Sequence, residues 1–313
     1  MKGLQLLATG GALPGRVVTN EDLSRQVDTS DEWITTRTGI RQRYYCTESE
    51  DAATLAIAAA RQALARSGLA ASEIACCVAA TLSAPTATPS VACRVQAALG
   101  LPENRPAFDV NAACSGFIYA IAAAHGLLNT LGGRYALVIG CEALSRMVDP
   151  TDRTTCVLFG DGAGAAILEL AEDVPFAVTL GARGSEAIRV GGPAACDTAP
   201  ITMDGKAVFR FAVETMPRCL QTVLERSQKT LADLDWVVCH QANVRILDAS
   251  IRRLGMPAEK FYRNLDRYAN TSAASIPLAL DEMRENGLLQ PGQKMILVGF
   301  GGGLTWAGVY MEV

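Results

Sequence analysis

Three residues of this sequence have side chains and surroundings suited to nucleophilic catalysis, and they are Cys114, His240 and Asn270. Cys114 follows a short strand-like run, residues 107–110, and precedes an apolar Ala-rich stretch, so we predict that it lies at a helix N-terminus. The partial positive charge at that end of a helix favours the thiolate. We therefore expect a lowered pKa for Cys114 and a nucleophilic sulfur. A buried structural cysteine is the alternative, and it is our interpretation for most of the other nine cysteines.

His240 is the stronger of two candidate bases or hydrogen-bond donors. It follows the apolar run 236–239 and precedes a polar turn, a position where α/β folds display reactive groups. The other histidine, His125, lies in an Ala-rich stretch, where we expect a helix residue with a local partner. Asn270 either caps the helix that follows it or points its amide into a cleft.

Two glycine segments could bring backbone close to a ligand. Residues 300–303 (FGGG) follow a strand-like run, and their N–H groups would suit an oxyanion hole; a plain turn is the alternative. Residues 159–165 (FGDGAGA) satisfy a loosened G-x-G-x-x-A pattern. A short apolar run follows them in place of a clear helix, so we predict a tight turn and not a dinucleotide site.

The elements that must position these residues follow an α/β pattern. Short apolar runs alternate with Ala-rich stretches, which predicts a sheet that is covered on both faces. We expect helices over residues 54–67 and 116–128, and buried strands over residues 74–82, 135–140 and 295–299.

The sequence also repeats itself weakly, at offsets of 160 and 159 residues. The matched segments are residues 62–83 with 222–243, and residues 133–140 with 292–299. Two matches at nearly one offset predict two similar halves, residues 1–169 and 170–313, packed about a pseudo-two-fold axis. Loops near residues 83, 114, 240 and 271 would then converge on one cleft. Chance similarity between common α/β patterns is the alternative.

Composition excludes several classes of protein. The 313 residues are 50% hydrophobic and 19% charged, which is typical of a globular chain and excludes disorder. The net charge of −4 does not indicate a nucleic-acid partner, and we find no apolar run near the roughly 18 residues of a membrane span. Residues 1–13 are expected to form a first strand, not a signal peptide. Ten cysteines without a C-x-x-C pair, and only two histidines, indicate reduced thiols, a cytoplasmic location and no metal site.

Together, the motifs resemble the 3-oxoacyl-[acyl-carrier-protein] synthase III family of the thiolase superfamily, essentially from end to end. The segments that carry the resemblance, in the family's order, are residues 29–41 (TSDEWITTRTGIR), 149–153 (DPTDR), 159–164 (FGDGAG), 240–243 (HQAN), 270–275 (NTSAAS) and 300–303 (FGGG). Each is weak alone, but the combination is specific. The resemblance implies a thiolase-like five-layered α-β-α-β-α fold built from two duplicated halves.

The resemblance also implies the reaction. An acyl-CoA, with acetyl-CoA or another short or branched primer expected, acylates Cys114, and malonyl-acyl carrier protein then loses CO₂ and attacks the acyl group. The products are 3-oxoacyl-acyl carrier protein, CoA and CO₂, in the initiating step of type II fatty acid synthesis. His240 and Asn270 would stabilise the enolate, and the backbone N–H groups of Cys114 and Gly302 would form the oxyanion hole. Acyl-CoA is a substrate, so no cofactor is expected, and the family predicts a homodimer.

Binding residues carry over in the same way. The implied CoA-binding residues are Trp33, Arg37, Thr38, Arg153 and Asn243. Trp33 and Arg153 would sandwich the adenine, Arg37 would face a phosphate with Thr38 beside it, and Asn243 would bond the pantetheine arm.

The acyl carrier protein is acidic, and residues 245–267 carry six Lys/Arg against three Asp/Glu in an otherwise acidic chain. We therefore predict a docking surface that includes Arg245, Arg252 and Arg253. A solvated helix face is the alternative.

Two positions depart from the family pattern. Thr88 aligns with the segment that closes the acyl pocket across the family's dimer, where acetyl-preferring members place a bulky aromatic residue. The smaller Thr88 predicts a longer or branched primer. Ala269 stands where members often carry glycine, just before Asn270.

Several other functions compete with this interpretation. A related acyl-CoA acyltransferase or condensing enzyme of secondary metabolism is the main alternative. An elongating synthase would use a second histidine in place of Asn270, and a biosynthetic thiolase would need a further cysteine after Cys239, where the sequence has none. A papain-like protease shares the order Cys, His, Asn, but its cysteine lies near the mature N-terminus. Self-acylation would exclude a non-catalytic scaffold.

Overall fold

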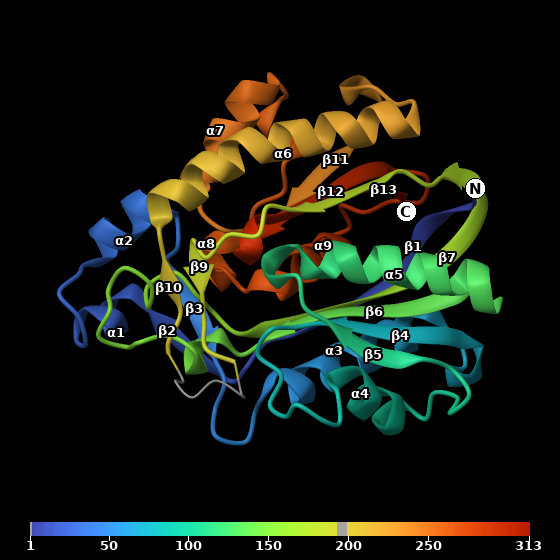
Figure 1. The fold of residues 1–313 in the computed structure, drawn as a ribbon, viewed down its shortest axis with the longest axis horizontal. Coiled ribbons are helices and arrows are strands. Elements are labelled where there is room, and N and C mark those ends of the chain that lie inside the picture. Colours follow the sequence, from blue (N-terminus) through green and yellow to red (C-terminus); the bar gives the residue numbers. More distant parts are fainter. Residues whose placement is uncertain (1, 193–198) are drawn as a thin grey trace.

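A computed structural model describes residues 2–192 and 199–313 of the chain. Helices and strands alternate through most of its length, as the sequence pattern predicts (Figure 1). Cys196, one of the ten cysteines, lies outside the described residues. The nine described cysteines form no disulfide.

Nine strands of the described residues form the main sheet system. They are β1 (Lys2–Ala12), β4 (Ile74–Ala80), β5 (Ala107–Val110), β6 (Tyr135–Glu142), β7 (Gly162–Pro175), β8 (Val178–Ala182), β11 (Trp236–Cys239), β12 (Lys294–Gly301) and β13 (Thr305–Glu312). Their order is β11-β12-β13-β1-β7-β6-β4-β5, with β8 also beside β13. The join between β1 and β13 is the single pair Gln5 and Glu312, so the system divides there into two sheets. Two small ribbons pair β2 (Arg16–Thr19) with β3 (Gln42–Tyr45), and β9 (Ile188–Arg189) with β10 (Thr202–Met203).

Helices cover both sheets and fill the space between them. They are α1 (Asn20–Ser24), α2 (Asp31–Thr38), α3 (Ala52–Ser67), α4 (Val91–Leu99), α5 (Gly116–Leu131), α6 (Gly205–Ser227), α7 (Val244–Leu254), α8 (Leu265–Tyr268) and α9 (Ser275–Glu285). In Figure 1, α6 and α7 lie outside one sheet, α3 and α4 lie outside the other, and α5 and α9 lie between the sheets. The arrangement has five layers, α-β-α-β-α.

Helix α5 lies at the centre because it is apolar nearly all round. Phe117, Ile118 and Ile121 are fully buried, and the helix packs against β4 and β6 on one side and β12 and β13 on the other. Residues 113–131 are long and apolar enough to cross a membrane by length and composition, which the sequence estimate missed. Half of the most apolar window is buried inside the fold, as expected of a core helix.

The two sheets use the same pairing pattern. Strands β4 and β6 run parallel, and β6 turns back antiparallel into β7. Strands β11 and β12 likewise run parallel, and β12 turns back antiparallel into β13. Residues 169 and 170, the boundary expected between the halves, both lie within β7. The division into two halves stays a prediction.

The expected elements are present with small changes at their ends. Helix α3 begins at Ala52, two residues early, because the Asp51 side chain caps it by accepting from Thr54 N at 2.7 Å. His125 is a buried residue of α5, and its Nε2 lies 2.8 Å from the carbonyl oxygen of Lys2. Residues 162–165 of the 159–165 segment already belong to β7, and Phe159 forms an isolated bridge with Asn270, so the predicted tight turn is wrong. No dinucleotide-binding helix follows the segment, as expected.

Candidate active site

Cys114 lies in the 3₁₀ turn Ala113–Ser115, between the end of β5 and the start of α5. This confirms the predicted place at a helix N-terminus. Gly301, at the end of β12, packs against it so closely that a Cβ atom at residue 301 would lie 2.7 Å from the Cys114 nitrogen. No side chain fits at residue 301, so the glycine loop and the cysteine turn are held against each other.

The expected lowering of the Cys114 pKa is wrong. The side chain is only 9% exposed, and this burial raises the pKa of the Cys114 thiol to about 12. Loss of water around the thiolate destabilises it more than the helix N-terminus stabilises it, and the nearby Glu142 raises the pKa of the thiol further. The resting residue is therefore a neutral thiol that must lose its proton during the reaction.

His240 directly follows β11 and is 1% exposed. Burial lowers its pKa to about 3, so the imidazole is neutral at physiological pH. Its Nδ1 lies 2.7 Å from the Oγ of Ser275, and that hydroxyl accepts a long hydrogen bond from Gln241 N at 3.4 Å. The hydroxyl can then donate its own proton to Nδ1. This arrangement assigns the ring proton to Nε2.

Of the two roles that the sequence left open for Asn270, capping of the next helix is wrong, since the N-cap residue of α9 is Ala274 and makes no side-chain hydrogen bond. The Asn270 side chain lines the main cavity, and its Oδ1 accepts from Ser272 N at 2.9 Å. Backbone bonds to Leu158 and Gly160 fix its position. Ala269 before it has φ 58° and ψ −159°, a conformation that glycine adopts at lower cost. Alanine is accommodated here, with strain.

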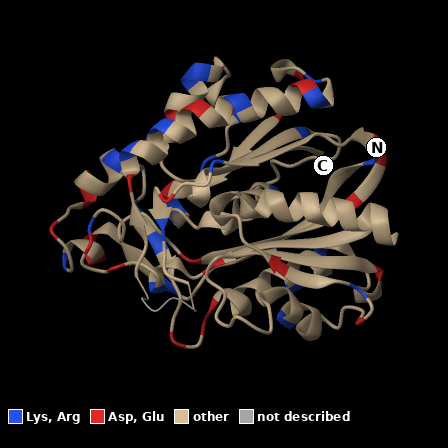
Figure 2. Ribbon diagram, viewed as in Figure 1, with Lys and Arg blue, Asp and Glu red and all other residues tan. Residues whose placement is uncertain are grey.

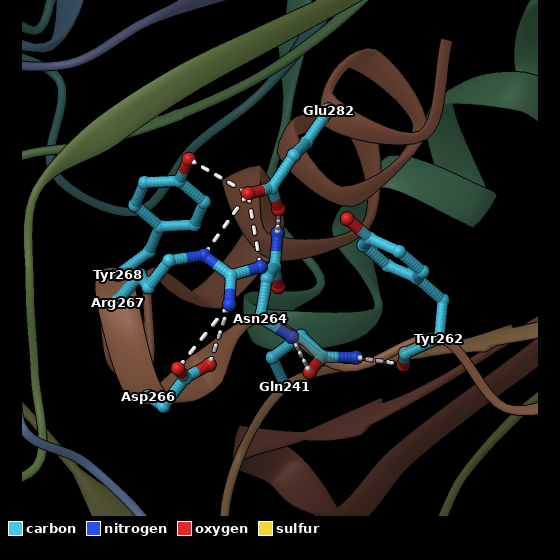
Figure 3. A network of polar contacts seen from close by, with 7 residues as sticks. All are labelled: Gln241, Tyr262, Asn264, Asp266, Arg267, Tyr268 and Glu282. Atoms are coloured by element: carbon cyan, nitrogen blue, oxygen red, sulfur yellow. Dashed lines mark hydrogen bonds and ion pairs between the residues drawn. The ribbon is translucent and has the colours of Figure 1, made fainter. Parts of the chain in front are cut away.

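A polar network joins the segments that carry His240 and Asn270 (Figure 3). Gln241, next to His240, accepts from Asn264 N at 3.2 Å, and the Asn264 amide donates to Glu282 at 2.9 Å. Glu282 also accepts from Arg267 Nε at 3.0 Å and from the hydroxyl of Tyr268 at 3.1 Å. Tyr268 lies two residues before Asn270. Glu282 on α9 therefore ties the two segments to one rigid helix.

A cavity of about 740 Å³ brings the predicted catalytic residues together. Its lining includes Cys114, His240, Asn270 and Gly302, together with Leu82 and Ser272. The prediction that loops near residues 83, 114, 240 and 271 share one neighbourhood is thus confirmed. Because buried apolar side chains such as Phe300 form much of the remaining wall, charges inside this cavity are poorly screened.

The expected CoA-binding residues divide into two groups. Arg37 and Asn243 line the cavity. Trp33 stacks with both arginines, since the guanidinium carbon of Arg37 lies 4.4 Å and that of Arg153 lies 5.3 Å from the ring centre. Thr38 does not reach the cavity, because it is buried and its hydroxyl donates to Ile34 O at 2.7 Å and accepts from Ile40 N at 3.0 Å.

Several of the residues that line the cavity are basic. Arg245 and Arg253 on α7 are exposed and contribute to the cavity lining, while Arg252 is exposed beyond it. Figure 2 shows basic residues recurring along α6 and α7. Two of them, Lys206 and Arg210, also line the cavity and were missed from the sequence. Their i, i+4 spacing could have indicated from the sequence that both lie on the same face of a helix.

Thr88 is exposed and does not line the cavity of its own chain. Its predicted role at the acyl pocket therefore requires a second copy of the chain. Within residues 2–192 and 199–313, no group of three or more His, Cys, Asp or Glu side chains could hold a metal ion. The sequence also missed Ser275, which contacts His240, and Ser272 and Glu142, which act on the Cys114 thiol. Ser272 and Ser275 lie inside the 270–275 motif, but nothing local distinguishes Glu142.

The chain is similar to known proteins of one family in both sequence and structure. Residues 108–184 match the family 3-oxoacyl-[acyl-carrier-protein (ACP)] synthase III, and residues 224–313 match its C-terminal domain. The beta-ketoacyl-[acyl-carrier-protein] synthase III of Rhizorhabdus wittichii is 46% identical over 320 residues, covering 98% of each chain. The crystal structure of 3-oxoacyl-[acyl-carrier-protein] synthase III from Aquifex aeolicus superposes with a TM-score of 0.93, at 42% identity over 99% of this chain and 100% of that one. A priming beta-ketosynthase of the R1128 polyketide pathway has a TM-score of 0.94 at 33% identity, covering 100% and 96%.

Proposed function

This chain belongs to the 3-oxoacyl-[acyl-carrier-protein] synthase III family, and from that premise we propose that Cys114, His240 and Asn270 carry out its reaction. The protein is a condensing acyltransferase of fatty acid synthesis. It joins the acyl group of an acyl-CoA to malonyl-acyl carrier protein in the initiating condensation. The observation that carries the residue assignment is the meeting of one thiol and two neutral donors in a single cavity.

Acylation of Cys114 is the first half of the reaction. The sulfur attacks the thioester carbonyl, the C–S bond to CoA breaks, and the acyl group remains on Cys114. The backbone N–H groups of Cys114 and Gly302 would hold the oxyanion that develops. The tight contact between Gly301 and Cys114 supports this role, since it fixes the two peptide segments before substrate arrives.

Decarboxylation and condensation form the second half. Loss of CO₂ from the malonyl group leaves an enolate whose oxygen needs hydrogen-bond donors. His240 Nε2–H and the Asn270 amide can donate there, and neither group needs to change its charge. The carbanion then attacks the acyl-Cys114 carbonyl and releases the sulfur.

Substrate binding follows from charge and stacking. Arg153 lies 5.3 Å from the centre of the Trp33 ring, so it would have to move off that ring for the two side chains to enclose the adenine of CoA. Arg37 would lie near a phosphate and Asn243 on the pantetheine arm. Thr38 supports this region from inside, through its bonds to the backbone. The exposed arginines Arg245, Arg252 and Arg253 provide a basic surface for the acidic carrier protein.

Assembly and location complete the proposal. Strand β5 ends the sheet order, so its free edge can pair with the same edge of a second copy in a homodimer. In that dimer, Thr88 of one subunit would close the acyl pocket of the other. A cytoplasmic location suits a catalytic thiol that must stay reduced. The shared strand-pairing pattern supports a division into halves 1–169 and 170–313.

Intact-protein mass spectrometry tests this function. The wild-type chain is mixed with acetyl-CoA and with longer and branched acyl-CoAs, beside the C114A variant. We expect one acyl adduct that C114A lacks and that malonyl-acyl carrier protein discharges as a 3-oxoacyl product. Adducts from longer primers would support the Thr88 prediction, and a strict acetyl preference would contradict it. An adduct that malonyl-acyl carrier protein cannot discharge would refute the condensation.

A further inference from the structure

Glu142 is a fully buried acid next to the catalytic thiol, and the reaction as described above does not use it. It ends β6, at the same edge of the sheets where the Cys114 turn lies. Its Oε2 accepts three hydrogen bonds, from Ser83 Oγ at 2.5 Å, Leu82 N at 3.2 Å and Thr81 Oγ1 at 3.3 Å. Its Oε1 is buried and has no hydrogen-bond partner among the described residues. One oxygen is therefore fully engaged, and the other remains available.

Ser272 begins the 3₁₀ turn Ser272–Ala274, which packs against both β6, where Glu142 lies, and the turn that carries Cys114. Its side chain is 2% exposed, and its hydroxyl interacts with both the thiol and the carboxyl group. Neither contact is a complete hydrogen bond, since Ser272 Oγ also lacks a hydrogen-bond partner among the described residues. A buried polar atom without a hydrogen bond destabilises the fold, and two of the eight such side-chain atoms among the described residues lie beside the nucleophile. Their placement makes a short route from the sulfur to a carboxylate.

The thiol needs such a route. Cys114 begins as a buried neutral thiol, and its proton must leave as the sulfur attacks. In the tautomer inferred above, Nδ1 of His240 accepts from Ser275 and Nε2 carries the ring proton, so His240 has no free nitrogen lone pair for the Cys114 proton. Its lowered pKa of about 3 also makes it a weak base, whereas burial raises the pKa of Glu142 to about 7. Glu142 is the stronger acceptor.

We propose that Glu142 takes up the Cys114 proton through the Ser272 hydroxyl as the sulfur attacks the acyl-CoA. The S–H proton passes to Ser272 Oγ while the Ser272 proton passes to Glu142 Oε1, and the S–C bond forms in the same step. When the C–S bond to CoA breaks, the proton returns along the same path to the departing CoA thiolate. This inference rests on the acylation step of the proposed function.

The charge balance of the pocket supports this route. Above pH 7, where Glu142 is mostly ionised, the buried negative charge is on its carboxylate before attack, and during attack this charge moves toward the thioester oxygen as Glu142 becomes neutral. The pocket therefore holds a single buried negative charge throughout this step, and no second charged group has to lose its water. The ionisable groups that act on this site are the Cys114 and Cys141 thiols beside Glu142, with Asp109 acting on Cys141.

Alkylation of Cys114 by iodoacetamide tests the relay without acyl-CoA. The rate of Cys114 modification is followed by peptide mass spectrometry between pH 5.5 and 9 in wild-type, E142Q, E142D and S272A proteins. D281N is the matched control, because Asp281 is another buried acid, on α9, paired with Arg66. In the wild type we expect the rate to rise through a limb near pH 7. E142Q and S272A should lose that limb and react about 10²-fold more slowly at pH 7.5, with E142D between them.

A purely electrostatic role of Glu142 predicts the opposite effect on the alkylation rate. If Glu142 acted only as a negative charge near the thiol, E142Q would make Cys114 more acidic and its alkylation faster. A rate in E142Q equal to or above that of the wild type would overturn the proposal. A buried ionised carboxylate destabilises the fold, so E142Q should unfold at the same thermal midpoint as the wild type at pH 8. If E142Q fails to fold, an alkylation rate in S272A equal to that of the wild type would overturn the relay instead. Failure of wild-type acylation by any acyl-CoA, with alkylation behaving as expected, would refute only the proposed function.

Discussion

The contact between Ser275 and His240 allows a sharp test of how the histidine works. Ser275→Ala removes the hydroxyl that lies 2.7 Å from His240 Nδ1. Both residues are at most 2% exposed, so solvent has poor access to replace the lost donor. The ring then loses the group that assigns its proton to Nε2. A fraction of the protein would carry the proton on Nδ1 and present an acceptor to the enolate.

The magnitude follows from the strength of one neutral hydrogen bond. Such a bond contributes about 0.5–1.5 kcal/mol, and 1.36 kcal/mol corresponds to a tenfold change in rate. The second bond to Ser275, from Gln241 N, is long at 3.4 Å and adds little. We therefore expect S275A to slow malonyl decarboxylation about fivefold. Complete loss of the donor in H240A should cost about 10²–10³-fold.

The assay measures the two half-reactions separately. Release of CO₂ from malonyl-acyl carrier protein reports the donor, and self-acylation by acetyl-CoA reports Cys114. S275A should slow the first and leave the second within about twofold. S250A is the control, because Ser250 on α7 is also fully buried and, within residues 2–192 and 199–313, its hydroxyl donates only to the sulfur of Met216, at 3.6 Å. Unchanged decarboxylation, or an equal loss in both half-reactions, would refute the assigned tautomer.

Two other predictions concern stability and docking. Ala269→Gly should raise the free energy of unfolding by about 1 kcal/mol, because relief of a strained φ of 58° exceeds the entropic cost of glycine. Thermal unfolding should show a midpoint about 2 °C higher. A midpoint lower than that of the wild type would contradict the strain at Ala269. Arg252→Glu should raise the KM for malonyl-acyl carrier protein about fivefold at low salt, with self-acylation unchanged. Arg226→Glu, at the far end of α6, is the matched charge control, and an equal effect from both variants would argue against a local docking surface.

Local patterns were sufficient for much of this protein. Apolar runs predicted β4, β5, β6, β11 and β12 to within two residues at either end, because buried strands leave a continuous apolar signature. The position of Cys114 before an apolar helix, and of His240 after an apolar strand, could be read from neighbouring residues alone. Helix ends were less certain, since caps such as Asp51 depend on side-chain geometry.

Only the tertiary structure decided the electrostatics of the site. The sequence placed Cys114 at a helix N-terminus and so predicted an acidic thiol, but burial reverses the shift. Desolvation depends on every segment that packs around a group, and those segments come from both ends of the chain. Thr38 turned inward and Glu142 came to lie beside the thiol for the same reason. Sequence determined which groups were present and which elements carried them; packing determined their protonation and their partners, because both are set by neighbours distant in the chain.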